Sequence, residues 1–348
     1  MKNILMMGLT LPLPGGSERH IYEISSRMPN CTVLTQKGSS CKNKIELPVI
    51  KKTTFTRAIS FLLVTSLYTF ALILTPKKKY TVIHIHENLT YLLIPLLKLR
   101  YKVVVTVHGF QGFKFYDNKF LWFFFGNCLK LADKIVTHGY YETEVLQKVY
   151  REVKNIPDGV DLDLYKKINE KVQKKISFVG RIHEQKGISF LLDAFEKISK
   201  EFPEYTLEIL AKSEGHLYES LRKKHPNKNI IWRGFILDRD TLFADMCSST
   251  LLVYPSMWEA IPWPALLEGL ASGRPVIASH LYGMEKIFND SKDIVLVKPG
   301  DSDALAKSIA KLLKDKKLAE EIGKQGKKTA SSYDLESMAK ELYEYYGE

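Results

Sequence analysis

The chain has 348 residues, which is enough for two domains of ordinary size, and its apolar fraction of 45% excludes an intrinsically disordered protein. Its four cysteines, Cys31, Cys41, Cys128 and Cys247, are far apart and lack the spacing of a metal site, so we expect reduced thiols in a cytoplasmic protein. The first predicted strand begins directly after Met1, so we expect no signal peptide.

The net charge of +12 is unevenly distributed along the chain. Residues 1–170 contain 24 Lys and Arg against 13 Asp and Glu, whereas residues 171–348 contain 27 against 26. A half with a net charge of +11 suits an anionic partner, such as a phospholipid surface, a lipid-phosphate acceptor or an acidic glycan. An ordinary solvated surface is the alternative. No nucleic-acid-binding motif accompanies the charge, so we expect no nucleic acid partner.

The first predicted elements are a strand over Lys2 to Gly8 and a helix from about Ser17 to Met28. Gly15 and Gly16 lie in the turn between them. Glycine lets a backbone approach a ligand closely, and a helix start provides free N–H groups for an anion. A tight turn without a ligand would use the same glycines. Residues 31–36 are predicted to form the second strand.

Residues 58–76 contain no charged side chain, and their length reaches the threshold for a membrane span. Several Ser and Thr side chains interrupt the apolar run. A span would also place Gly15 and Gly16 across a bilayer from His108. We therefore interpret the stretch as a helix packed on the sheet, with one side able to lie against lipid. A true span is the less favoured alternative.

Two further strands are predicted over residues 81–87 and 102–109. His84 and His86 alternate onto one face of the first strand. A metal site would need further ligands, and we expect none. His108 lies at the carboxyl end of the second strand, where ligands bind in open α/β sheets. The aromatic residues over 110–125 fit a core, an acceptor-binding wall or an interfacial anchor, and the sequence does not decide among these.

The second half begins with a predicted strand over Lys175 to Arg181, followed by Lys186, Gly187 and a helix. The guanidinium of Arg181 offers a fork of donors to phosphate oxygens, and Lys186 offers a point charge. This pair after a strand indicates a diphosphate site, with two ordinary surface cations as the alternative. Further strands are predicted over 205–212 and 229–236, the latter containing the turn Gly234-Phe235.

Residues 251–279 are predicted to form a strand, a loop, a helix, a tight turn and a strand. Pro264 suits the first position of the helix because its missing N–H costs nothing there. Together with Ala265 and Leu266 it would form a helix start facing an anion. Glu268, one turn later, can accept hydrogen bonds from sugar hydroxyls, and Glu259 flanks the loop.

These motifs resemble the signatures of retaining glycosyltransferases of family 4, which have the GT-B fold. The resemblance is carried by the Gly15-Gly16 loop, the segment Ile156 to Asp161, the Arg181–Lys186 pair and the stretch from Glu259 to Glu268. Two departures are visible. Glu259 stands one residue earlier than the family's Glu-x7-Glu spacing, and Pro262 and Pro264 remove backbone donors from the loop.

The resemblance implies an α/β chain of two Rossmann-like domains facing a central cleft. The expected division is an acceptor-binding domain over residues 1–160, a linker over 161–175, a nucleotide-sugar-binding domain over 176–325 and a helix over 326–348 that crosses back to the first domain.

The implied activity is transfer of a hexose from a nucleotide-diphosphate sugar to a hydroxyl of a lipid-linked or polysaccharide glycan of the cell envelope, with retention of anomeric configuration. The family works without a metal or cofactor, and a UDP-sugar is expected more than a GDP-sugar. Catalytic roles fall to His108, Glu259, Arg181 and Lys186. Donor contacts fall to Gly15, Gly16, Arg181, Lys186, Gly234, Phe235, Pro264, Ala265, Leu266 and Glu268.

We expect a cytoplasmic protein, with a peripheral position on the cytoplasmic face of the membrane as an option for the basic half. Two alternatives remain open from the sequence. One is a different enzyme of the same fold, a sugar-nucleotide epimerase or a phosphorylase, and the other is a non-catalytic GT-B scaffold or partner subunit at the membrane.

Overall fold

The computed structural model describes residues 2–9, 16–50, 54–109, 119–166, 168 and 170–347. The chain divides into two compact units. Unit 1 comprises Met1–Asp158 and Leu335–Glu348, and unit 2 comprises Gly159–Asp334. The division therefore falls after residues 158 and 334, where the sequence suggests boundaries near 160 and 326. The segment proposed as a linker contains a short helix, α7 (Leu162–Lys166), that belongs to unit 2.

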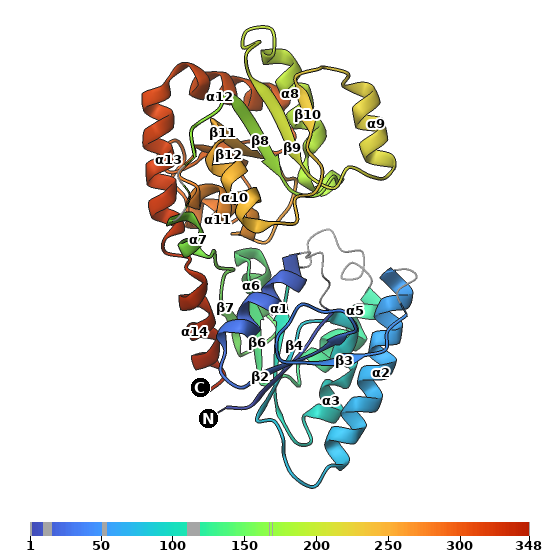
Figure 1. The fold of residues 1–348 in the computed structure, drawn as a ribbon. Coiled ribbons are helices and arrows are strands. Elements are labelled where there is room, and N and C mark those ends of the chain that lie inside the picture. Colours follow the sequence, from blue (N-terminus) through green and yellow to red (C-terminus); the bar gives the residue numbers. More distant parts are fainter. Residues whose placement is uncertain are drawn as a thin grey trace. The chain divides into compact units, whose positions relative to one another are not determined.

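Unit 1 is built on a seven-stranded parallel sheet (Figure 1). Its strands are β1 (Ile4–Met7), β2 (Cys31–Gln36), β3 (Lys44–Leu47), β4 (Val82–Ile85), β5 (Lys102–Val107), β6 (Lys134–Thr137) and β7 (Val153–Asn155), in the order β3-β2-β1-β4-β5-β6-β7. The chain order reverses between β1 and β4, which is the point where open α/β sheets bind ligands.

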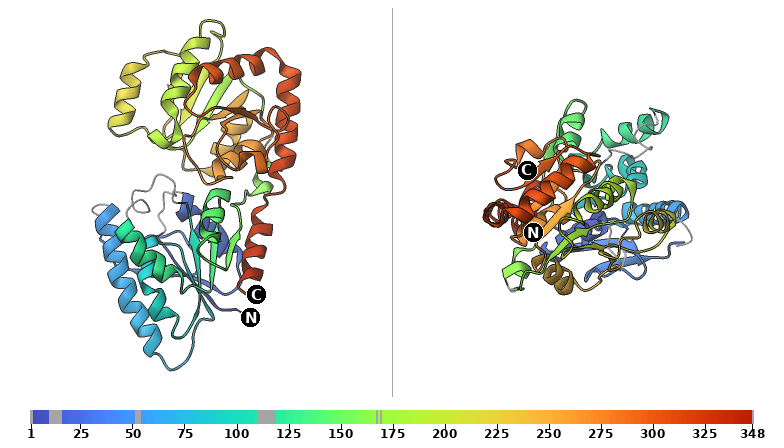
Figure 2. Two further views of the ribbon diagram at one scale, coloured as in Figure 1. Left: turned by 180° about the vertical axis from the view of Figure 1, so that it is seen from behind. Right: turned by 90° about the horizontal axis from the view of Figure 1, so that it is seen from above.

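Helices cover both faces of this sheet (Figure 2), because successive apolar side chains of each strand point to opposite faces. Ile4 and Met6 of β1 pack against α1 (Gly16–Arg27) and α14 (Leu335–Tyr345). Leu5 and Met7 face the opposite layer. That layer consists of α2 (Thr54–Leu74), the 3₁₀ helix η1 (Asn88–Leu93), α3 (Ile94–Leu97), α5 (Lys119–Leu129) and α6 (Tyr140–Gln147).

The last helix of the chain, α14, completes unit 1. Met338 and Leu342 lie in the same core cluster as β1 and α1. The Tyr346 hydroxyl is 2.6 Å from His84 Nδ1, and Lys102 donates to the Tyr346 carbonyl at 3.0 Å. Unit 1 is therefore assembled from the two ends of the chain.

Unit 2 is built on a six-stranded parallel sheet of order β10-β9-β8-β11-β12-β13. Its strands are β8 (Lys175–Val179), β9 (Thr206–Leu210), β10 (Ile230–Trp232), β11 (Leu251–Tyr254), β12 (Val276–Ser279) and β13 (Val295–Val297). Its helices are α7, η2 (Glu184–Lys186), α8 (Ile188–Ile198), α9 (His216–Lys224), α10 (Arg239–Cys247), α11 (Pro264–Ala271), η3 (Met284–Lys286), α12 (Ser302–Lys314) and α13 (Lys316–Ala330). Here the chain order reverses between β8 and β11.

The predicted fold class is confirmed, since both units are Rossmann-like α/β layers around parallel sheets. The uncharged stretch near residue 60 forms α2. Its segment Thr56–Leu74 is long and apolar enough to cross a membrane by length and composition, and 28% of it is buried.

Candidate functional site

The predicted donor residues of unit 2 gather where its chain order reverses. The loop after β8 contains Arg181 and η2, and the loop after β11 runs from Pro255 to Trp263. Because β8 and β11 are neighbouring parallel strands, these two loops leave the same edge of the sheet side by side.

Close backbone contact holds the two loops together. The Met257 N–H donates to the Gln185 carbonyl at 2.7 Å, and the Gln185 side-chain amide donates to the Trp258 carbonyl at 3.0 Å. Gly187 has φ +61°, and a Cβ at this position would lie 1.9 Å from the Pro255 carbonyl oxygen. Only glycine allows this approach, so the Lys-Gly pair fixes Lys186 against the second loop.

Glu259 is the centre of the resulting polar group. Its Oε1 accepts from Lys186 Nζ and, at 2.9 Å, from the Ser256 hydroxyl. Its Oε2 lies 3.2 Å from the Gln185 amide nitrogen, and Gln185 in turn accepts from Arg181 at 3.2 Å. The structure thus joins Arg181, Lys186 and Glu259, three residues that the sequence predicted as functional, through Gln185, which it did not. Two cations held at one sheet edge can bind a diphosphate.

Glu268 occupies a separate, buried position on α11. It accepts a hydrogen bond from Arg239 at 3.4 Å, a partner that sequence reasoning missed. Burial, together with the negative charge of Glu268, raises the pKa of Tyr254 well above its ordinary value, so its hydroxyl stays protonated. Gly269 is required beside it, because a Cβ would lie 2.7 Å from the Tyr254 ring.

The remaining predicted donor residues lie at two turns of unit 2. Pro264, Ala265 and Leu266 form the first turn of α11, where the Leu266 N–H donates to the Trp263 carbonyl at 3.1 Å. Gly234 has φ +78° and precedes the exposed Phe235. In unit 1, Gly16 begins α1, and Gly15 lies outside the described residues.

Unit 1 carries a cluster of histidines at the carboxyl edge of its sheet. His86, His108 and His138 follow the neighbouring strands β4, β5 and β6. His20 of α1 joins them, with its ring centroid 4.2 Å from that of His138 and 5.1 Å from that of His108. His86 Nδ1 is 3.0 Å from His108 Nε2. Sequence reasoning singled out His108 for function but gave no signal for His20, which a helix brings in from far along the chain.

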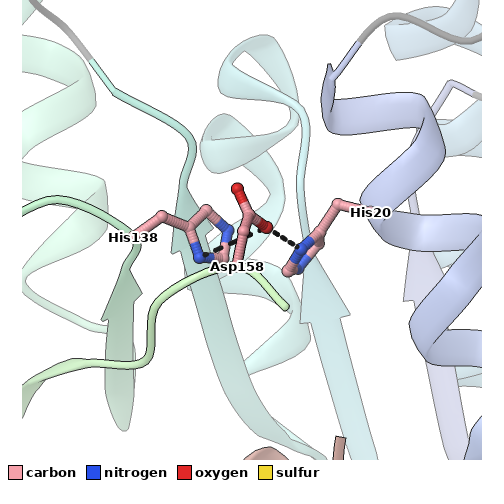
Figure 3. Close-up of side chains that lie close together, drawn as sticks. All are labelled: His20, His138 and Asp158. Atoms are coloured by element: carbon pink, nitrogen blue, oxygen red, sulfur yellow. Dashed lines mark hydrogen bonds and ion pairs between the residues drawn. The ribbon is translucent and has the colours of Figure 1, made fainter. Parts of the chain in front are cut away.

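Asp158 orients part of this histidine cluster (Figure 3). Its Oδ1 lies 2.7 Å from His20 Nδ1 and 3.9 Å from His138 Nδ1. His138 Nδ1 also lies 2.8 Å from the Ile156 carbonyl, an acceptor, so that nitrogen carries the proton. The Nε2 atoms of His20 and His138 are buried and have no hydrogen-bond partner among the residues that the structure describes. They are left as proton acceptors.

Burial keeps most of these imidazoles neutral. Burial and the neighbouring histidines lower the pKa of His86 and His108 well below the ordinary value, and burial with His138 lowers the pKa of His20. Burial alone would raise the pKa of Asp158, but His138 and the hydrogen bond from His20 outweigh it and lower that pKa. At neutral pH the edge therefore holds neutral imidazoles at His20, His86 and His108 and a carboxylate at Asp158.

Donor atoms of His20, His138 and Asp158 lie within 4.8 Å of one another, a spacing that a metal ion could bridge. However, His20 Nδ1 and Asp158 Oδ1 already bond to each other, and His138 Nδ1 bonds to a carbonyl. These hydrogen bonds use the atoms that would bind the ion. We therefore assign the group to hydrogen bonding.

His84 and Glu87 lie beside the histidine cluster and differ from it in their hydrogen bonds and pKa. His84 is held between Thr106 at 2.7 Å and Tyr346, which suits a structural role. Glu87 follows β4 on the same edge. Burial and the negative charge of Glu18, partly opposed by Arg57, raise the pKa of Glu87 to about 7. Its carboxyl is therefore half-protonated near neutral pH.

Comparison with known proteins agrees with this geometry. The model described as Glycosyltransferase Family 4 matches residues 14–164, and the model described as Glycosyl transferases group 1 matches residues 163–329. Two parallel-sheet units that are matched by these two models define a glycosyltransferase with the GT-B fold. The chain belongs to the family 4 glycosyltransferases, and it uses a nucleotide sugar as substrate. The predicted family and enzyme class are thus confirmed.

Individual relatives are distant. An uncharacterised glycosyltransferase of Methanocaldococcus jannaschii is 24% identical over 99% of this chain and 98% of its own length. A phosphatidyl-myo-inositol mannosyltransferase of Mycobacterium leprae is 29% identical over 55% of this chain and 52% of its own. The Anabaena protein HepE, solved in complex with UDP-glucose, is 16% identical, with a TM-score of 0.80 over the full length of both chains.

Proposed function

We propose that the protein transfers a hexose from a UDP-sugar to a hydroxyl of a lipid-linked or polysaccharide glycan of the cell envelope, with retention at the anomeric carbon and without a metal ion. The observation that carries the donor half is the joined group of Arg181, Lys186 and Glu259 at the reversal point of unit 2. HepE, bound to UDP-glucose, supports the choice of base and sugar for this chain.

In this proposal unit 2 binds the donor. Arg181 and Lys186 bind the diphosphate oxygens, and Glu268 accepts hydrogen bonds from the ribose. Gly234 and Phe235 contact the base, while the first turn of α11 faces the phosphates. As the bond between the sugar and the diphosphate breaks, negative charge grows on the leaving oxygen, and the two cations stabilise it. No metal is needed for that role.

Unit 1 binds the acceptor in this proposal. The acceptor hydroxyl attacks the anomeric carbon from the side on which the diphosphate leaves, so the configuration is retained. Its proton passes to the departing phosphate oxygen, and no protein nucleophile is required. In this proposal His108 has its catalytic role at the acceptor edge of unit 1. In this proposal the Nε2 atoms of His20 and His138, which have no partner among the described residues, accept hydrogen bonds from acceptor hydroxyls.

The relative that acts on phosphatidyl-myo-inositol supports an acceptor carried on a lipid. The net charge of +11 over residues 1–170 supports a position on the anionic, cytoplasmic face of a membrane. We therefore include a cytoplasmic, peripheral membrane location in the proposal.

The test is a thermal-shift panel of UDP, GDP and ADP and their sugars, with and without a chelator. A ligand that binds only the folded state at 100 times its Kd stabilises it by about 2.7 kcal/mol. We expect a rise in Tm with UDP and its sugars that the chelator does not change. The Lys186→Ala variant should lose that rise.

Lys212→Ala is the matched control, since Lys212 is an exposed cation of the same unit, paired with Glu214. It should keep the rise in Tm. If no nucleotide raises Tm, or if Lys186→Ala responds like the wild type, the donor site is wrongly assigned.

A further inference from the structure

The outward side of α2 is a continuous apolar stripe. Its most exposed large side chains recur at steps of three and four residues, so they lie on one face of the helix. They are Ile59 (36% exposed), Leu63 (62%), Leu67 (71%), Phe70 (55%) and Leu74 (79%). A surface helix normally presents polar side chains to water, so this arrangement calls for a partner.

The inward side of α2 is more polar than the outward side. Ser60, Thr65 and Thr69 are buried there beside Phe61 and Leu72, which belong to the core of unit 1. The usual distribution, with apolar residues inward and polar residues outward, is thus partly reversed. Such a reversal is typical of a helix whose outer side also meets an apolar medium.

Neighbouring elements of the same layer expose further apolar side chains. The helices α2 and α5 both contact η1, and the ribbon views show α2 and α5 on the same side of the sheet (Figures 1 and 2). α5 exposes Phe123 and Phe124, η1 exposes Leu92, and Leu99 is exposed just after α3. We call this set, together with the α2 stripe, the outer apolar face.

The segment that forms this face is strongly basic. Residues 50–131 contain 12 Lys and Arg against two Asp and Glu. Lys77, Lys78 and Lys79 follow directly after α2 and are exposed. A second copy of the chain would bring the same positive charge against itself, whereas an anionic bilayer would attract it.

We infer that the outer apolar face docks on an anionic lipid bilayer, with α2 lying along the interface and the lysines beyond its end contacting the headgroups. α2 lies on the bilayer and does not cross it, because crossing would pull Phe61 and Leu72 out of the core of unit 1. The inference rests on the proposed function, which supplies a reason for the docking. It deepens that function by assigning the surface that meets the lipid.

The direction of α2 connects this surface with the acceptor side. α2 joins β3 to β4, which are parallel strands of one sheet, so it runs antiparallel to them. Its amino end therefore lies at the carboxyl edge of the sheet, the edge that carries His86 and His108. A bilayer against α2 extends to that edge, where a lipid-borne hydroxyl can enter.

The experiment is co-sedimentation of the full chain with vesicles of phosphatidylcholine alone and of phosphatidylcholine mixed with phosphatidylglycerol, at low and high salt. The wild type should bind the anionic vesicles in a salt-sensitive manner. Leu67→Glu places a charge at the centre of the stripe and should lower the partition coefficient by about tenfold or more. Replacing Lys77, Lys78 and Lys79 with Gln should lower binding to anionic vesicles by about fivefold per lysine. Binding to neutral vesicles should stay unchanged.

Val172→Glu is the matched control, because Val172 is an exposed apolar residue of unit 2. It should bind vesicles like the wild type. The inference is overturned if Leu67→Glu binds like the wild type, or if the wild type does not bind anionic vesicles at low salt. It is also overturned if the face instead holds a dimer, seen as a wild-type dimer that Leu67→Glu converts to monomer.

UDP binding, measured in parallel by thermal shift, separates the two proposals. Leu67→Glu lies far from the donor residues in sequence and belongs to the other unit, so it should keep the UDP-induced rise in Tm. Loss of vesicle binding with UDP binding intact tests the docking alone. Absence of UDP binding in a wild type that still binds vesicles contradicts the proposed function alone.

Discussion

Glu259 occupies an unusual position for a residue expected at the donor sugar. It accepts hydrogen bonds from Lys186, Ser256 and Gln185 at once, so its negative charge offsets the cation assigned to the diphosphate. A diphosphate and Glu259 would then compete for Lys186. Although Glu259 stands one residue earlier than the family spacing, its carboxylate thus still reaches Lys186 in the same site.

Replacing Glu259 with Gln should separate binding from turnover. The substitution removes a negative charge beside Lys186, so UDP affinity should rise by about fivefold, as expected for the loss of roughly 1 kcal/mol of charge interaction. Sugar transfer should fall, because the contact proposed for the sugar is weakened. Isothermal titration with UDP and a transfer assay measure the two effects. Glu214→Gln, at an exposed pair, should change neither, and an unchanged UDP affinity in Glu259→Gln would argue against the competition.

Sequence reasoning at this scale found charged residues in motifs but not their partners. Arg181, Lys186, Glu259 and Glu268 stand in recognisable spacings. Arg239, which pairs with Glu268, begins a different helix, and no spacing connects the two. Such partners come from tertiary packing, which local patterns do not record.

At the scale of elements, the short helix η2 shows how a loop becomes a binding element. Gly187 ends η2 in a left-handed conformation and lets the Pro255 carbonyl approach. The strand, cation and glycine pattern of this region was readable from the sequence because each part has a local cause. The edge strands β3 and β7 were missed because charged and polar side chains interrupt their apolar residues, and α13 was missed because its buried positions are small residues such as Ala319, Gly323 and Gly326.

Gly187→Ala should therefore destabilise unit 2 and weaken UDP binding together. The left-handed backbone costs an alanine about 1–2 kcal/mol, and the clash with Pro255 adds to that cost. Gly234→Ala isolates the first contribution, because Gly234 has φ +78° with open space around its added Cβ. Urea unfolding measures both variants. Equal losses of unfolding free energy in the two would show that the loop contact contributes nothing.

At the scale of the whole molecule, the two units differ in their buried ionisable groups. Among the described residues, the histidines with lowered pKa are His20, His84, His86 and His108, and all lie in unit 1. The division into two units was largely readable from the sequence, through the restart of the strand pattern at Lys175. The histidine cluster was not, because it depends on the register of four separate elements.

Unit 1 should therefore lose stability on acidification, more than unit 2. A histidine with a lowered folded pKa takes up its proton on unfolding, so stability falls as pH drops below about 6.5. Glu87 acts in the opposite sense, since its folded pKa of about 7 lies above its unfolded value. The four histidines and the opposing Glu87 together give a net uptake of up to three protons on unfolding. The free energy of unfolding of unit 1 therefore changes by roughly 4 kcal/mol per pH unit at most.

Hydrogen exchange between pH 7.5 and 5.5, read separately for the two units, measures this difference. His86→Gln should reduce the pH slope of unit 1 by about one proton and leave that of unit 2 unchanged. Identical slopes in the two units would contradict the assignment of the buried histidines.

The place of α14 has a consequence for how the protein is made. Ribosomes release the amino end of a chain first, and most domains can fold as soon as they have emerged. Unit 1 cannot do so, because Met338, Leu342 and Tyr346, which complete its core, are synthesised only after the whole of unit 2. Unit 2 is continuous and can fold while the β-sheet of unit 1 still lacks its covering helix. Unit 1 is thus begun before unit 2 and completed after it, and its exposed sheet must be protected until α14 has emerged.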